Sequence, residues 1–128
     1  MAELSNYLEN KLLDHILKNV SYTSPTTVYV GLFTSDPTDA GSGTEISGNS
    51  YARKNLSVST AAAGITTSSA DVTFDQATGN WGTISHIGLF DALTSGNLLM
   101  HTALTTSKTI ETGDIFKIPS GSLTATLD

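Results

Sequence analysis

The fold of this chain is decided by two apolar stretches joined through a turn, GTISHIGLFD at residues 82–91 and NLLMHTAL at residues 97–104. Apolar residues occupy both alternating faces of each stretch, a pattern typical of strands covered on two sides. A turn centred on Ser95-Gly96 predicts an antiparallel hairpin in which Phe90 pairs with His101. Such a hairpin belongs at the centre of a sheet, with a second sheet over one face and the N-terminal helix or a partner molecule over the other.

This register sorts the apolar side chains of the hairpin into two sets. One face is predicted to carry Ile84, Phe90, Leu99 and Ala103, and the other Ile87, Leu89, Leu98, Met100 and Leu104. Both sets are large enough to need a cover, so neither face of the hairpin is expected to meet solvent.

Shorter strands are predicted on both sides of the hairpin. They lie at residues 27–34, 51–59, 70–75, 114–118 and 122–127, with a weaker candidate at 107–111. Frequent turns between short strands are typical of sandwiches. The sequence therefore predicts a mainly β fold, a single antiparallel β-sandwich of immunoglobulin-like or jelly-roll type preceded by one N-terminal amphipathic α-helix. A small barrel is the close alternative.

The helix is predicted at residues 4–18, where leucines and an isoleucine recur at helical spacing, and Asn19 is its expected C-terminal cap. Its apolar stripe must lie against the chain's own sheet or against a neighbouring subunit. A chain of 128 residues fits one domain over 1–128. Within it we expect a helical arm at 1–20 and the sandwich at 26–128.

Composition excludes several classes of protein. The net charge is −6 with only six Lys and Arg residues, which argues against binding a nucleic-acid backbone. No apolar run approaches the length of a membrane span, and no secretory signal is expected at the N-terminus. The absence of Cys removes disulfides, thiol catalysis and Cys-based zinc sites.

The sequence offers little catalytic chemistry. It has neither a nucleophile-elbow motif nor a phosphate-binding glycine loop. In the predicted register, His86 and His101 lie about four rungs apart, or ~13 Å, too far to share one metal ion, and His15 has no spaced partner. We therefore expect no enzyme, no cofactor and no metal site, with histidines that pack or form hydrogen bonds.

The segment SDPTDAGSGTEISGNS at residues 35–50 is the longest stretch without periodicity, and loops of this length are usually functional or mobile. Its acids Asp36, Asp39 and Glu45 do not have the spacing of a calcium loop. They are expected in turns, where an Asp side chain accepts backbone N–H bonds. One of the neighbouring Arg53 and Lys54 is expected to pair with a loop acid.

Trp81 is the one candidate for a carbohydrate-binding platform, because it stands beside Asn80. The alternative, which the sequence favours, is a packing residue in the core or at the sandwich edge.

Taken together, these segments resemble a known family. They are LSNYLENKLLDHIL (4–17), PTTVYVGLFTSDPTDAGSGTEISGNSYARKNL (25–56), FDQATGNWGTISHIGLFDALTSGNLLMHTALTTSKTIETGD (74–114) and GSLTATLD (121–128). The chain resembles small virion proteins encoded in the structural gene clusters of tailed bacteriophages, commonly labelled tail fibre or hypothetical virion proteins. The resemblance spans nearly the whole chain.

The resemblance implies a non-enzymatic virion component, made in the host cytoplasm and present as a homo-oligomer or in many copies. A capsid decoration (cement) protein on the outer head lattice, bound to the major capsid protein or other virion proteins, is the leading interpretation. A tail fibre, collar or baseplate-associated component is the alternative, and recognition of a host surface glycan is a third. The residues predicted to contact partners are Leu4, Tyr7, Leu8, Leu12, Asp36, Asp39, Glu45 and Trp81.

Overall fold

The structure is a computed structural model that describes residues 2–127 of the chain. Its elements in chain order are β1 (Glu3–Leu4), α1 (Asn6–Leu17), β2 (Val28–Phe33), β3 (Lys54–Leu56), β4 (Ile65–Thr67), β5 (Val72–Thr73), β6 (Gly82–Phe90), β7 (Leu98–Ile110), β8 (Lys117–Ile118) and β9 (Thr124–Thr126). All strand pairs are antiparallel. The predicted class, mainly β with one N-terminal helix, is confirmed.

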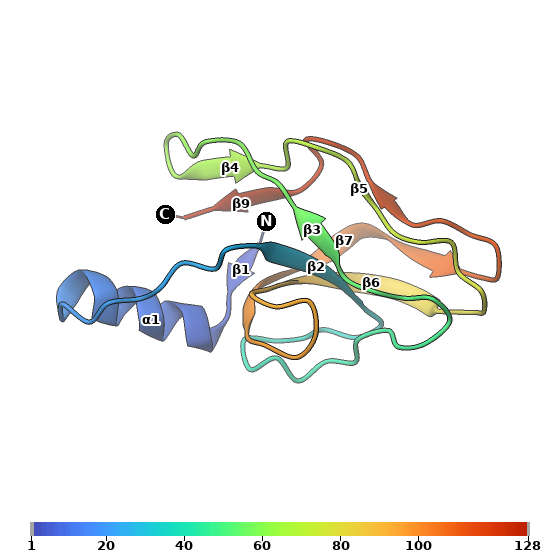
Figure 1. Cartoon of the computed structure of the whole chain (residues 1–128), viewed down its shortest axis with the longest axis horizontal. Coiled ribbons are helices and arrows are strands. Elements are labelled where there is room, and N and C mark those ends of the chain that lie inside the picture. The colour runs from blue at the N-terminus through green and yellow to red at the C-terminus, as the bar shows by residue number, and fades with distance from the viewer. Residues whose placement is uncertain (1, 128) are drawn as a thin grey trace.

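One layer of the sandwich is a five-stranded sheet with the order β1-β7-β6-β2-β3, and the other consists of two short ribbons, β4-β9 and β5-β8. Figure 1 shows both ribbons on the same side of the large sheet. Between the layers lies a core that includes Leu32, Ile84, Phe74, Trp81 and Phe116. Aromatic rings fill its centre, with edge-to-face contacts between Phe74 and Phe116.

The opposite face of the large sheet is covered by loops. Phe33, Phe90 and Leu98 form a second, smaller buried cluster there, and the segments between β2 and β3 and between β6 and β7 lie over this face (Figure 1). A Cβ on Gly41 of the first loop would stand 3.7 Å from the Leu98 side chain. The chain's own loops, rather than the helix, therefore cover this second cluster of the hairpin.

The central hairpin exists as predicted, but its register is different. Phe90 pairs with Leu98 and Gly88 with His101, so the predicted pairing of Phe90 with His101 is wrong. The turn closes earlier because the Asp91 carboxylate accepts hydrogen bonds from the backbone N–H of Asn97 at 2.7 Å and from its side-chain amide at 3.0 Å.

Two register shifts within the hairpin also change the predicted faces. One lies between Ile84 and His86, where β7 places residues 104–107 opposite Ser85 alone, and the other lies between Leu89 and Phe90. A bulge moves the following side chains to the other face of a strand. Leu98, which lies beyond such an irregularity in β7, therefore joins Phe90 in the second cluster. Ile84 lies with Ile87 in the main core, not on the face of Phe90 as predicted. The weak strand predicted at 107–111 is the continuation of β7.

The chain's N-terminal segment enters the large sheet before the helix begins. Leu4, expected in the first turn of the helix, instead pairs with Met100 in the β1–β7 ladder. Ser5 is the N-cap, and its hydroxyl accepts a hydrogen bond from the Leu8 N–H. Lys18, and not the predicted Asn19, is the C-cap. Asn19 follows it with a positive φ of 57°, the left-handed conformation common in the residue just beyond a cap.

Candidate functional site

The helix α1 extends away from the edge of the sandwich, and the segment after it returns alongside the helix to β2 (Figure 1). The Tyr7 and Tyr22 rings meet edge to face at 6.5 Å, and the Tyr22 N–H donates to His15 Nδ1. The returning segment thus contacts the helix through Tyr22. None of the residues in α1 is buried.

The C-terminal half of α1 presents an uncovered apolar surface. Ile16 is 72% exposed and Leu17 is 77% exposed, and Leu13 and Val20 are also exposed. A group of large apolar side chains left open to solvent marks an interaction surface. We call these four residues the helix-tip patch. The chain's own sheet, one of the two predicted targets of the apolar stripe, does not cover it.

The helical residues predicted to contact partners lie closer to the sandwich than this patch. Leu4, Tyr7, Leu8 and Leu12 are all half-buried. Leu8 lines a groove of about 520 Å³ with Val58, Leu99 and Met100. The members of the helix-tip patch were missing from the predicted contact residues, although Leu13 and Leu17 already widen the apolar stripe in the sequence.

The root of α1, Ser5 and Asn6, is held by hydrogen bonds to two neighbouring segments, β7 and the loop that follows β2. The Ser5 hydroxyl donates to the Leu98 carbonyl at 2.5 Å and the Ser5 N–H to the Leu99 carbonyl at 2.9 Å. The Asn6 N–H donates to the carbonyl of Asp39, in the loop that follows β2, at 3.0 Å. The direction in which the helix leaves the sandwich is therefore fixed by hydrogen bonds to β7 and to this loop.

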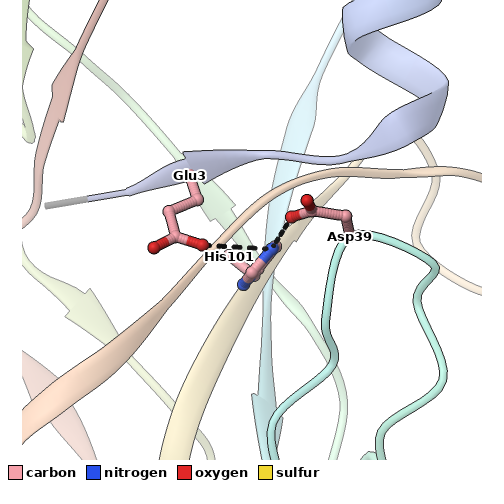
Figure 2. A group of neighbouring side chains, drawn as sticks. All are labelled: Glu3, Asp39 and His101. Atoms are coloured by element: carbon pink, nitrogen blue, oxygen red, sulfur yellow. Dashed lines mark hydrogen bonds and ion pairs between the residues drawn. The ribbon is translucent and has the colours of Figure 1, made fainter.

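A cluster of ionisable side chains lies beside this root, and Figure 2 shows that its members come from three separate segments. His101 Nε2 is 2.8 Å from Asp39 Oδ1 and 4.0 Å from Glu3 Oε2. On the other side of the ring, Nδ1 is 3.8 Å from Asp36 Oδ1. The imidazole is only 5% exposed, while the three carboxylates reach solvent. The fold thus brings Asp36 and Asp39 together around His101. Neither the spacing nor the periodicity of the sequence indicated this arrangement.

Glu45, the third loop acid that was predicted to contact a partner, forms an ion pair within the chain. Its carboxylate pairs with Arg53 through two bonds of 2.8 Å, and Arg53 also donates to the carbonyls of Ala92 and Ser95. The guanidinium lies 3.5 Å from the centre of the Phe90 ring. The prediction that Arg53 or Lys54 pairs with a loop acid is confirmed. This network connects the two loops that cover the second face of the sheet.

Tyr51 completes that network. Its hydroxyl donates to Glu45 at 2.6 Å and accepts the Leu32 N–H at 2.9 Å. Burial raises the pKa of Tyr51 far above its ordinary range, and the hydrogen bond to Glu45 raises it further. The phenol therefore stays protonated and serves as a fixed donor.

Trp81 is a core residue. It is 5% exposed, its ring meets Tyr51 edge to face at 5.5 Å, and its indole N–H donates to the Asn49 carbonyl at 3.0 Å. A sugar-binding platform needs an exposed ring face, which the buried Trp81 does not have. Trp81 is therefore a packing residue, the alternative that the sequence favoured, and it has no open surface for a partner.

The remaining sequence expectations concern the histidines and the loop turns. His86 and His101 are two residues apart along the ladder, since they pair with Ala103 and Gly88, rather than about four rungs apart as predicted. His86 Nδ1 is 2.8 Å from the neighbouring Ser85 hydroxyl. Asp36 accepts the Thr38 N–H at 2.8 Å, which is the expected turn hydrogen bond.

The structure thus defines a class by its architecture, a small β-sandwich that carries one N-terminal helix with an exposed apolar tip. The chain belongs to the family described as Podophage GP4 fiber I protein gp80, whose model matches residues 3–126. It is therefore a structural protein of the bacteriophage virion. No curated protein matches the chain. Within residues 2–127, no helix is both long enough and apolar enough to cross a membrane.

Proposed function

We propose that this protein is a non-enzymatic fibre component of the virion, attached to its neighbouring virion protein through α1. The observation that carries the proposal is the helix-tip patch, Leu13, Ile16, Leu17 and Val20, which stays open to solvent on a helix fixed at its root. Burying one leucine or isoleucine side chain contributes roughly 1.5–3 kcal/mol. Leu13, Ile16 and Leu17 on α1, with Val20 just beyond its end, supply several kcal/mol of docking free energy.

The family description favours a fibre over capsid decoration. It names a fiber protein, and the outer head lattice, which the sequence favoured, has no separate structural observation behind it. Docking by α1 serves either location, because the apolar patch requires only a complementary groove. The copy number per virion separates the two, since a decoration protein approaches a simple ratio to the major capsid protein and a fibre does not.

Recognition of a host glycan draws no support from Trp81, which is buried. The proposal needs no cofactor, because attachment through an apolar helix face requires none.

The test is incorporation of variants into virions. In Leu17→Glu and Ile16→Glu, a charge replaces an exposed apolar side chain, so the sandwich keeps its fold while the apolar contact is lost. The matched control is Leu93→Glu, at a residue that is equally apolar, half exposed and located on the turn between β6 and β7. We expect purified virions to contain at least ten-fold less of each helix variant than of the wild-type protein. The control variant should be incorporated at the wild-type level. Normal incorporation of folded Leu17→Glu protein contradicts the proposal.

A further inference from the structure

We propose that Glu3, Asp39 and His101 together bind one first-row transition-metal dication, for which Zn²⁺ is the probe. The candidate ligand atoms, one from each residue, all lie within 4.8 Å of one another. Imidazole nitrogen combined with carboxylate oxygen is a donor set that such ions accept. Solvent-exposed carboxylates on the open side leave room for water as the remaining ligand.

The geometry needs only small movements to close around an ion. Ligands about 2.1 Å from a metal lie roughly 3–3.5 Å from each other, and the two distances to His101 Nε2 are 2.8 Å for Asp39 and 4.0 Å for Glu3. The side chains of Glu3 and Asp39 are 73% and 47% exposed, so both carboxylates can adjust. The imidazole, in contrast, is held in the sheet and supplies the fixed ligand.

The charge of the cluster favours a cation. Three carboxylates, from Glu3, Asp36 and Asp39, surround one imidazole. Among the described residues, no lysine or arginine forms an ion pair with any of the three. A dication at His101 Nε2 replaces a single shared proton and offsets the mutual repulsion of the carboxylates.

Asp36 adds a negative charge on the other side of the imidazole. Its Oδ1 lies 3.8 Å from His101 Nδ1, the ring nitrogen that faces away from the proposed ligands. At this separation the Asp36 carboxylate is too far to accept a hydrogen bond from the ring, and it contributes to the site through its charge. The carboxylate of Asp36 is itself positioned by the Thr38 N–H.

A metal at this position would join three segments around the root of α1, namely β1, β7 and the loop that follows β2. Glu3 is in β1, directly opposite His101 in the ladder, and Asp39 is the residue whose carbonyl accepts the Asn6 N–H. Binding would therefore stabilise the junction between the sandwich and the helix. This inference is independent of what α1 docks against.

The alternative is a hydrogen-bonded cluster without a metal, and calorimetric titration of ZnCl₂ into the untagged full chain separates the two. We expect saturable binding of one ion per chain, with affinity that falls as pH is lowered, because protons compete for the imidazole. Glu3→Gln and Asp39→Asn each remove one ligand charge and should raise Kd at least ten-fold. Glu3→Gln leaves the fold intact because the Glu3 side chain is largely exposed.

Two control variants address other sources of zinc binding. His15→Gln removes the exposed histidine of α1, and Asp75→Asn removes an exposed carboxylate far from the cluster. Both should leave Kd unchanged. Absence of saturable binding to the wild-type chain, binding that His15→Gln abolishes, or equal affinity of the Glu3→Gln and wild-type chains overturns the proposal.

Discussion

The sandwich core and the tip of α1 contain the same kinds of side chain in opposite environments. Leu32 and Ile84 are fully buried between the two layers, whereas Ile16 and Leu17 are mostly exposed. A leucine in the core stabilises the fold of this chain, while a leucine at the helix tip stabilises only an assembly that contains it. Apolar periodicity thus indicates that a face will be covered, and the structure shows whether the chain covers it itself.

The largest expected effect is in the core. Phe74 is one of the largest fully buried side chains and contacts the rings of Tyr51 and Phe116. Phe74→Ala should lower the free energy of unfolding by about 3–5 kcal/mol, because it removes apolar contacts and leaves a cavity. Ile16→Ala should change it by less than about 0.5 kcal/mol. Urea unfolding of both variants measures the contrast, and similar losses would show that α1 packs against the sandwich.

Breaking the Glu45–Arg53 pair should have the next largest effect. Glu45→Gln leaves a buried guanidinium without its carboxylate, and removing one partner of a buried pair typically costs about 3 kcal/mol. The chain offers a matched control in Asp75→Asn, which removes the carboxylate from the exposed Lys54–Asp75 pair and should cost less than about 1 kcal/mol. Equal losses in chemical unfolding would show that Arg53 is solvated in solution.

Ser5→Ala tests the junction between the two regions. It removes the N-cap acceptor and the hydroxyl that donates to the Leu98 carbonyl. A cap and a buried hydrogen bond together contribute roughly 1–2 kcal/mol. Circular dichroism should show reduced helix content with the β signal retained, and Ser5→Thr should restore part of the helix. Unchanged helicity in Ser5→Ala would mean that the cap does not hold α1.

The smallest effect is expected at the β5-β8 ribbon, where Asp71 accepts the Ser120 N–H and pairs with Lys117. The hydrogen bond from Ser120, with the help of Lys117, lowers the pKa of Asp71. A lowered pKa in the folded state adds stability above the ordinary carboxyl pKa, and this stability is lost as pH falls through the folded value. In Asp71→Asn, the free energy of unfolding should therefore fall slightly less steeply than in the wild type as the pH drops below about 4. An unchanged acid-unfolding profile would contradict this account.

Local patterns predicted the elements that dominate the fold. The helix and the strands β2, β6 and β7 have strong periodicity, and Asn19, the predicted cap, lies one residue beyond the Lys18 C-cap. The register of the hairpin could not be predicted, because it depends on the Asp91–Asn97 hydrogen bonds and on two bulges. The short strands β1 and β4 have too few residues to show a pattern.

The candidate sites depend on contacts between residues that are distant in the sequence. Asp39 and His101 are separated by 62 positions, and neither residue's local spacing suggested that they meet. The helix-tip patch was visible as extra apolar residues, but its exposure follows from the direction in which α1 leaves the sheet. That direction is set by backbone hydrogen bonds at Ser5 and Asn6, which no side-chain pattern reveals.

The central claim, that α1 attaches this protein to the virion, is tested most directly by a cryo-EM map of the intact phage particle at side-chain resolution. The account predicts that Leu13, Ile16, Leu17 and Val20 lie buried against a neighbouring virion protein, with the loops around Asp36 and Asp39 resting at the helix root. A map in which these four side chains face solvent while a face of the sandwich makes the attachment would contradict it.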